Sequence, residues 1–165
     1  MNHVRLKNFF LKSLAIILIF LLDRIAKIYI LKLAELENTV DFYLTSYLNI
    51  YLIWNKGIAF GLFSFDQSTI YNSISLVIML ITILVLIMIL NTEGIKQYSL
   101  ILIFGGSIGN LFDRIYYSAV PDFIDLHIRD FHWFIFNVAD IFITFGVIFL
   151  ILIELKSNKK NDKSI

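Results

Sequence analysis

The stretch from Leu76 to Leu90 limits the fold more than any other part of the chain. Its 15 residues include no charged side chain and only one hydroxyl group, that of Thr82. Extended back to Ile70, it reaches the roughly 20 residues that a helix needs to cross a membrane. The whole sequence is 59% hydrophobic, compared with about 45–50% in a soluble domain. We therefore expect a single α-helical membrane domain covering residues 1–165.

Three further apolar segments complete a predicted set of four transmembrane helices. The expected helices cover about residues 8–33, 70–90, 96–112 and 136–155. The basic residues before the first helix resemble the start of a signal peptide, which would then show a small-residue cleavage site. Instead the polar segment Asp23 to Lys27 follows, and the apolar pattern resumes at Ile28. We therefore interpret the first segment as a retained helix.

The region of about 36–66 between the first two helices has a different pattern. From Leu48 to Asn55, side chains alternate between two faces and include aromatic and β-branched residues, which favours a strand. Asn55, Lys56 and Gly57 then supply turn chemistry. We expect a small extracytoplasmic antiparallel β-sheet here, a second outer loop at 113–135, and a disordered basic tail at 156–165.

The basic residues predict the orientation of the helices. Eight of the 14 lie in the amino-terminal arm, the 91–98 loop or the tail: Arg5, Lys7, Lys12, Lys96, Lys156, Lys159, Lys160 and Lys163. The other two loops hold only Lys56, Arg114 and Arg129. The positive-inside rule therefore predicts that both termini are cytoplasmic. The net charge of +1 gives no indication of a nucleic-acid partner.

Cysteine and histidine give little support for a metal site or cofactor. The chain has no cysteine, which excludes disulfides and thiol chemistry. The histidines are His3, His127 and His132, and the last two are five residues apart rather than at a helical ligand spacing. We therefore predict neither a metal site nor a cofactor.

Polar residues are concentrated between Gly105 and Asp140. These 36 residues include five aspartates, two asparagines and two arginines. The predicted topology brings them to the outer membrane surface, together with Asp23 and Asn55. Ionisable groups at membrane depth indicate a functional site. Asp23 and Lys27, four apart on one helix face, form either an internal ion pair or part of that site.

Four kinds of function could use this polar cluster. A serine hydrolase is suggested by Gly105-Gly106-Ser107-Ile108-Gly109, but this G-x-S-x-G pattern lies within an apolar helix rather than at a strand-to-helix turn. Gly105 and Gly109 are better explained by close helix packing. An ion or proton transporter is disfavoured because the polar groups are not spread across the bilayer and no internal repeat is present. A non-catalytic chaperone or assembly factor remains open.

The fourth possibility is a hydrolase that uses a pair of aspartates. Two neighbouring carboxyl groups tend to share one proton. The ionised group can then activate water, while the protonated group donates to the departing nitrogen. The candidates are Asp113, Asp122, Asp125, Asp130 and Asp140. Asp140 stands out because it lies in an apolar segment with no basic residue at i±3 or i±4.

Five motifs, in order, resemble those of the lipoprotein signal peptidases, the bacterial signal peptidase II family. They are Asp23-Arg24-Ile25-Ala26-Lys27, Asn55-Lys56-Gly57-Ile58-Ala59-Phe60-Gly61, Gly109-Asn110-Leu111-Phe112-Asp113-Arg114, Asp122-Phe123-Ile124-Asp125 and Phe136-Asn137-Val138-Ala139-Asp140. The resemblance covers nearly the whole chain. One departure is Pro121, which replaces an aliphatic residue before the aspartate.

The resemblance implies a fold, an activity and roles for particular residues. The fold is four transmembrane helices with an extracytoplasmic β-cradle. The activity is cleavage of prolipoproteins before a diacylglyceryl-modified cysteine, by a monomer in the cytoplasmic (inner) membrane that contacts lipid and requires no cofactor. The implied catalytic pair is Asp122 and Asp140. The implied supporting residues are Asp23, Lys27, Asn55, Gly57, Asn110, Asp113, Arg114 and Asn137.

Overall fold

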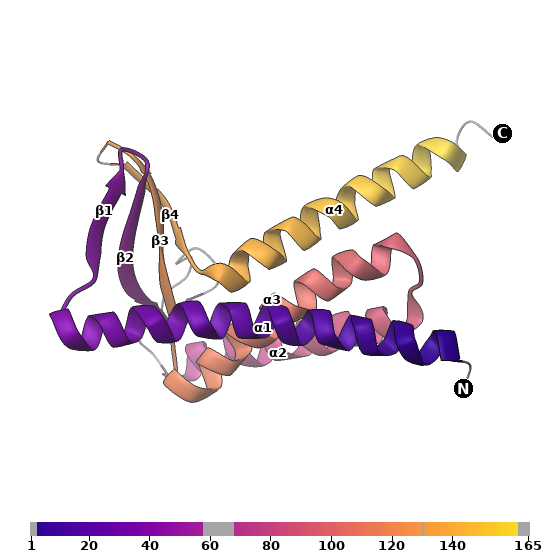
Figure 1. Cartoon of the computed structure of the whole chain (residues 1–165), viewed down its shortest axis with the longest axis horizontal. Helices are drawn as coiled ribbons and strands as arrows, with labels where there is room; N and C mark the ends of the chain where they lie inside the picture. The colour runs from indigo at the N-terminus through magenta and orange to yellow at the C-terminus, as the bar shows by residue number, and fades with distance from the viewer. Residues whose placement is uncertain (1–2, 58–67, 130, 162–165) are drawn as a thin grey trace.

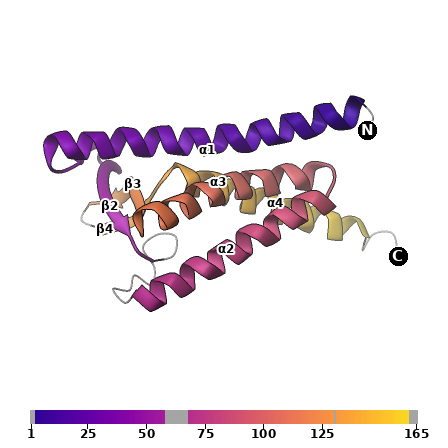
Figure 2. The same cartoon turned by 90° about the horizontal axis from the view of Figure 1, so that it is seen from below.

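The computed structural model describes residues 3–57, 68–129 and 131–161, and combines long helices with one antiparallel sheet. The helices are α1 (His3–Glu37), α2 (Ser68–Asn91), α3 (Ile95–Tyr117) and α4 (Val138–Asn161), and the strands are β1 (Asp41–Thr45), β2 (Leu48–Asn55), β3 (Val120–Ile128) and β4 (Phe131–Phe136). The sheet lies at one end of the helices, and both ends of the chain lie at the other (Figures 1 and 2).

Helix α3 is the central helix, because it packs against α1, α2 and α4. Its glycines allow these close approaches. A Cβ atom on Gly105 would lie 2.9 Å from Ile19 Cγ2, and one on Gly109 would lie 2.7 Å from Asp23 Oδ2, so both glycines face α1. A Cβ on Gly106 would lie 2.5 Å from the carbonyl oxygen of Ala139 in α4. The prediction that Gly105 and Gly109 serve helix packing is confirmed.

The four strands form a sheet in the order β1-β2-β3-β4. The expected strand at 48–55 is confirmed as β2, which pairs antiparallel with β1 and with β3. The pairing of Asn55 with Val120 brings together two segments that are separated in the chain by α2 and α3. On one side the sheet packs against the second half of α1, where Ile30, Val40 and Phe123 form a small core. The predicted region 58–66 lies outside the described residues.

The prediction of an outer loop at 113–135 is wrong for most of this segment, which forms helix and strand. Residues 113–117 continue α3, and β3 and β4 complete the sheet. Two features hide β3 in the sequence. Its first four residues are all buried, so they lack the in-and-out alternation of a half-exposed strand. Pro121 also argues against an inner strand, yet it lies near the start of β3, opposite Trp54.

The helices extend beyond their predicted bounds. Helix α1 begins at His3 and ends at Glu37, compared with the predicted 8–33. Helix α4 continues to Asn161, so residues 156–161 of the predicted disordered tail are helical. Lysine is a good helix former, which allows an apolar helix to continue into a basic segment. Residues 162–165 lie outside the described part of the chain.

Within the described part of the chain, two helices are long and apolar enough to cross a membrane by length and composition alone. They span Thr69–Asn91 in α2 and Val138–Ser157 in α4. Many large apolar side chains of these helices are exposed on the protein surface, including Leu80, Leu84, Phe149 and Leu152. Such a surface is suited to an apolar surrounding rather than to water.

Candidate active site

Asp122 and Asp140 line one cavity of about 160 Å³ between the sheet and the helices. Asp122 lies near the start of β3, and Asp140 lies in the first turn of α4. Both residues are buried, with 1% and 4% of their surfaces exposed. The cavity also has polar side chains from β2 and α3, namely Asn55, Ser107, Asn110 and Arg114. A second hollow, of about 740 Å³ between α3 and the far half of α4, contains no carboxylate among its lining residues.

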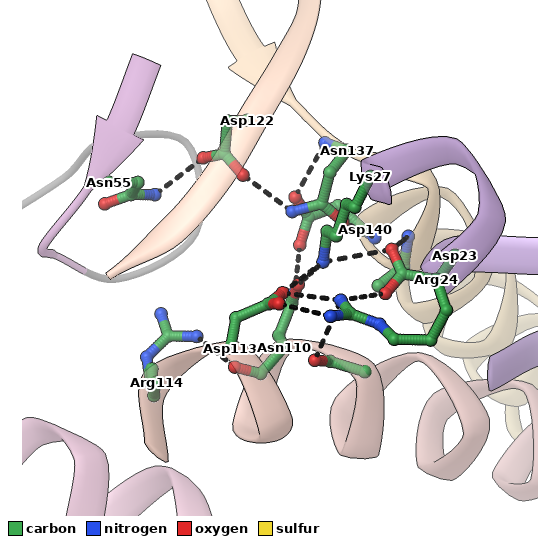
Figure 3. A network of polar contacts seen from close by, with 12 residues as sticks. Asp23, Arg24, Lys27, Asn55, Asn110, Asp113, Arg114, Asp122, Asn137 and Asp140 are labelled. Carbon is green, nitrogen blue, oxygen red and sulfur yellow. Dashed lines mark hydrogen bonds and ion pairs between the residues drawn. The ribbon is translucent and has the colours of Figure 1, made fainter. Parts of the chain in front are cut away.

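Asn137 connects the two aspartates (Figure 3). Its side-chain Nδ2 donates a hydrogen bond of 2.6 Å to Asp122 Oδ1. Its backbone N–H donates to Asp140 Oδ2 at 3.1 Å, and its Oδ1 accepts from the backbone N–H of Asp140 at 3.2 Å. The last two bonds form the reciprocal capping arrangement that starts a helix. The local structure that begins α4 therefore also fixes the position of Asp140 relative to Asp122.

Asp122 is held from its other side by Asn55. The Asn55 Nδ2 donates to Asp122 Oδ2 at 2.8 Å, while Asn55 Oδ1 accepts from the backbone N–H of Gly57 at 2.7 Å. Burial and, after it, the nearby charge of Asp140 raise the pKa of Asp122 to about 7, even though the hydrogen bonds from Asn55 and Asn137 act to lower it. The Asp122 carboxyl group can therefore hold a proton near neutral pH.

Asn110 on α3 links Asp140 to a buried lysine. The Asn110 Nδ2 donates to Asp140 Oδ1 at 2.8 Å, and its Oδ1 accepts from Lys27 Nζ at 2.9 Å. Because the amide uses both of its ends, the orientation of Asn110 is fixed. Asp140 therefore accepts hydrogen bonds at both of its oxygens, one from its own helix cap and one from α3.

An ion cluster of Asp23, Arg24, Lys27 and Asp113 lies behind this pair. Lys27 Nζ is 3.0 Å from Asp23 Oδ1 and 2.6 Å from Asp113 Oδ2. Arg24 contacts the same two carboxylates, at 2.8 Å and 2.6 Å. The two positive and two negative charges balance, which offsets the cost of burying them. Asp23 Oδ1 also accepts from the backbone N–H of Ala139 at 3.1 Å, so the cluster helps to cap α4.

Arg114 forms another wall of the cavity. Its Nη2 donates to the carbonyl oxygen of Gly57 at 2.9 Å, and its Nη1 donates to the carbonyl oxygen of Asn110 at 3.3 Å. The hydroxyl group of Tyr71 donates to the backbone carbonyl of Arg114 at 3.2 Å. Arg114 thereby connects α3 to the end of β2, and Tyr71 connects α3 to α2.

Comparison with known proteins identifies the family. The model of the family described as "Signal peptidase (SPase) II" matches residues 15–156. The chain belongs to the signal peptidase II family. A lipoprotein signal peptidase of Pelagibacter ubique (strain HTCC1062) is 58% identical over 98% of this chain and 100% of its own length. That of Anaplasma phagocytophilum (strain HZ) is 42% identical over 84% of this chain and 88% of its own length.

Two solved structures have a similar fold. One is described as a bacterial membrane enzyme structure obtained by the in meso method at 2.3 Å resolution; it has a TM-score of 0.68 and 27% identity, with 90% of each chain covered. The other carries the same description at 1.9 Å resolution, with a TM-score of 0.66, 29% identity, and coverage of 88% of this chain and 92% of that one.

The structure brings together all the residues that the resemblance to signal peptidase II selects. The predicted pair and its predicted supporting residues occupy one continuous buried region: Asp23, Lys27, Asn55, Gly57, Asn110, Asp113, Arg114, Asp122, Asn137 and Asp140. Two residues of the region are absent from the predicted set. Arg24 could have been found as the second cation beside Asp23, whereas the hydrogen bond of Tyr71 to another helix leaves no signal in the sequence.

The other aspartates considered as catalytic candidates have different partners, and Ser107 lacks the geometry of a nucleophile. Asp113 is bound by Lys27 and Arg24, and Asp125 lies against His132 on β4. Asp130 lies outside the described residues. Ser107 lines the cavity but lies in the middle of α3, not at a strand-to-helix turn. The strand-to-helix turn that a G-x-S-x-G nucleophile requires is therefore not formed around Ser107.

Proposed function

We propose that this protein is a membrane aspartic endopeptidase that removes the signal peptide from prolipoproteins. The observation that carries the proposal is the placement of Asp122 and Asp140 in one buried cavity, joined by Asn137. Membership of the signal peptidase II family supports a peptidase. The name of the relatives, lipoprotein signal peptidase, supports prolipoproteins as substrates.

The proposed reaction uses one proton shared by the two aspartates. The ionised carboxylate removes a proton from a water molecule as the water oxygen attacks the carbonyl carbon of the scissile peptide bond. The protonated carboxyl group donates its proton to the departing nitrogen as the carbon–nitrogen bond breaks. The raised pKa of Asp122, about 7, is consistent with a pair that keeps one proton near neutral pH. The pair titrates as a unit, so the two roles belong to the pair.

The surrounding side chains orient the two carboxyl groups for this reaction. Asn55, Asn110 and Asn137 donate hydrogen bonds to specific carboxylate oxygens, which limits rotation of both aspartates. Fixed geometry lowers the entropy that the reaction must lose to reach its transition state. The ion cluster of Asp23, Arg24, Lys27 and Asp113 supports this arrangement at a distance through Asn110 and the start of α4.

We further propose that all four helices cross the membrane. The charged residues of α1 and α3 that lie near the aspartate pair turn inward, where Asp23, Lys27 and Asp113 are fully buried and paired. The outward side of α1 remains apolar, with Phe9, Phe10, Ile17, Leu18, Leu21 and Leu22 exposed. Buried, paired charges are the form in which ionisable groups are tolerated at membrane depth. The sequence of these two helices alone is less apolar because it includes the charges of the site.

The proposed topology follows from the two ends of the molecule. Both termini lie at the end opposite the sheet (Figures 1 and 2), and the basic residues favour a cytoplasmic location for the termini. The sheet and the aspartate pair then lie towards the extracytoplasmic face of a bacterial inner membrane. A diacylglyceryl-modified cysteine can reach a site at that depth from the outer leaflet. The protein is proposed to act as a monomer, without metal or cofactor in the cleavage step.

The decisive experiment is cleavage of a diacylglyceryl-modified prolipoprotein by the purified protein. We expect Asp122→Asn and Asp140→Asn each to lower kcat by about 10²–10⁴-fold, the contribution typical of an acid or base. Asp41→Asn is a matched control, because Asp41 is an exposed aspartate in β1 of the same sheet. Near-normal cleavage by either cavity variant contradicts the aspartate pair. Proton flux in proteoliposomes that survives Asp122→Asn would instead favour a transporter.

A further inference from the structure

A second cluster of ionisable side chains lies on strands β3 and β4. One ligand atom from each of Asp125, His127 and His132 lies within 4.8 Å of the other two. His132 Nδ1 is 2.7 Å from Asp125 Oδ2, and His127 Nδ1 is 3.6 Å from the same oxygen. The two histidines are direct partners in the register of the β3–β4 hairpin. A spacing of five residues, which does not fit a helix, therefore brings both rings together across two strands.

This cluster is separate from the aspartate pair. Asp125 follows Asp122 by three positions on β3, and residues an odd number apart on a strand point to opposite faces of the sheet. The residues that line the cavity of the aspartate pair include Asp122 but none of the three residues of this cluster. The proposed cleavage reaction also assigns no role to them.

Two residues of the cluster are buried, but their polar atoms are not fully paired. Asp125 is completely buried and His127 is 7% exposed. Among the residues that the structure describes, Asp125 Oδ1 and His127 Nδ1 make no hydrogen bond. An unpaired polar atom in such a place is destabilising, because it has lost its hydrogen bonds to water without gaining others. A partner that accepts lone pairs from both nitrogen and oxygen, such as a cation, would remove this cost.

The donor set fits a divalent transition-metal ion. Two imidazole nitrogens and one carboxylate oxygen are typical ligands of zinc, at about 2.0–2.2 Å, with a fourth position left for water. Ligand atoms around such an ion are roughly 3.3 Å apart, a value that lies between the 2.7 Å and 3.6 Å contacts of Asp125. The His132 side chain is 54% exposed, so it can rotate to complete the site and gives the ion a route from solvent.

We propose that Asp125, His127 and His132 bind one Zn²⁺ ion that links β3 to β4. The link lies on the hairpin whose first strand carries Asp122 near its start and whose second strand leads into Asn137, so both residues lie at the open end of the hairpin. Binding therefore stiffens the part of the sheet that holds one aspartate and the residue bridging it to its partner. This site is a structural addition to the proposed peptidase and does not take part in its acid–base chemistry.

The test is metal titration of the purified, metal-free protein, prepared without a polyhistidine tag. Isothermal titration calorimetry with Zn²⁺ should give one equivalent, and Co²⁺ should give visible absorption bands of a bound nitrogen- and oxygen-ligated ion. We expect His132→Ala and Asp125→Asn each to weaken Zn²⁺ binding by at least about tenfold. His3→Ala is the matched control, because it removes the third histidine of the chain from outside the cluster.

Thermal unfolding separates a metal site from a hydrogen-bonded pair. If Zn²⁺ binds the folded protein, a hundredfold excess over its Kd should raise the melting temperature of the wild type and of His3→Ala, but not of His132→Ala. His132 is exposed enough for its alanine variant to fold. Absence of saturable Zn²⁺ binding, or equal affinity in the wild type and His132→Ala, overturns the proposal and leaves His132 as a hydrogen-bond partner of Asp125. The readouts do not depend on peptidase activity.

Discussion

Asn137 and Asp140 hold each other by two reciprocal hydrogen bonds across the first turn of α4. The Asn137 Oδ1 accepts from the Asp140 backbone N–H at 3.2 Å, and Asp140 Oδ2 accepts from the Asn137 backbone N–H at 3.1 Å. The remaining amide group of Asn137 donates to Asp122. One asparagine thus performs two tasks that substitution can separate, the capping of a helix and the joining of two carboxyl groups.

We predict that Asn137→Ser keeps most of the stability but little of the activity. Serine caps a helix about as well as asparagine, whereas alanine costs about 1 kcal/mol. The short serine side chain cannot both accept from the Asp140 backbone N–H and donate to Asp122, and alanine can do neither, so both Asn137→Ser and Asn137→Ala should lower kcat by roughly 10–100-fold. Melting temperature and cleavage rate measured on both variants test this. Equal loss of stability in the two would show that capping is not the role of the side chain.

The raised pKa of Asp122 predicts a specific dependence of stability on pH. Because burial raises the pKa from 3.8 to about 7, the folded protein binds more protons than the unfolded chain between these values. Its stability should therefore fall as the pH rises from about 4 to about 7. Asp122→Asn removes this titration, so the wild type should lose roughly 2–10 °C of melting temperature relative to the variant across the range. If the melting temperatures of the two proteins change equally between about pH 4 and about pH 7, the raised pKa of Asp122 is contradicted.

The glycines of α3 should differ in their tolerance of alanine. A Cβ on Gly106 meets the backbone oxygen of Ala139 at 2.5 Å, which cannot move without shifting α4. A Cβ on Gly105 meets only side-chain atoms of Ile19, at 2.9–3.1 Å, of which Cγ2 and Cδ1 can move by rotation while Cβ at 3.0 Å requires a small shift of α1. We expect Gly106→Ala to destabilise the protein by more than about 2 kcal/mol and Gly105→Ala by about 1 kcal/mol or less. Thermal unfolding of both variants in the same detergent gives the comparison, and the reverse order would contradict the close approach of α3 to α4.

Lys27 should be essential for stability because of its partners. Lys27→Met leaves Asp23 and Asp113 with Arg24 alone, so one buried negative charge is uncompensated. Breaking a buried ion pair in this way costs about 3–5 kcal/mol. The double variant Lys27→Met with Asp113→Asn restores neutrality and should recover part of the loss. If the double variant is no more stable than Lys27→Met, charge balance does not explain the cluster.

Ser107→Ala distinguishes the aspartate pair from serine chemistry. Ser107 lines the cavity, yet the helix around it offers none of the geometry of a serine nucleophile. We predict cleavage within about threefold of the wild type, since the substitution removes only a hydroxyl group. Complete inactivity of a folded Ser107→Ala protein would revive the serine hypothesis.

The sequence predicts more of the site than of the architecture around it. The resemblance carried by the five motifs selects Asp122, Asp140 and their asparagine neighbours, whereas the residue types alone leave five aspartates as candidates. The motifs do not reveal that Asn137 contacts both aspartates, since these hydrogen bonds join β3 to the start of α4. Arg24 lies within the first motif but is absent from the implied supporting residues, although it completes the charge balance of Asp23 and Asp113.

For the fold too, the sequence pattern predicts a single strand but not its pairing partners. The alternation of side-chain types from Leu48 to Asn55 predicts β2, although burial along this strand does not alternate strictly, because its register with β3 shifts between Ile50 and Ile53. It does not predict β3, because the start of β3 is buried on both faces and includes Pro121. The pairing of β2 with β3 joins residues more than 60 positions apart, and no local pattern encodes such a partner.

The sequence by itself therefore determined the apolar segments and the use of Gly105 and Gly109 in helix packing, for which periodicity and residue size are enough. Its resemblance to the signal peptidase II family selected most residues of the candidate site. Only the tertiary structure decided which partners those residues have: the bridge of Asn137 between Asp122 and Asp140, the neutral ion cluster behind it, and the meeting of Asp125, His127 and His132. The physical reason is that hydrogen bonds and ion pairs depend on distances of about 3 Å, which folding sets between segments far apart in the chain.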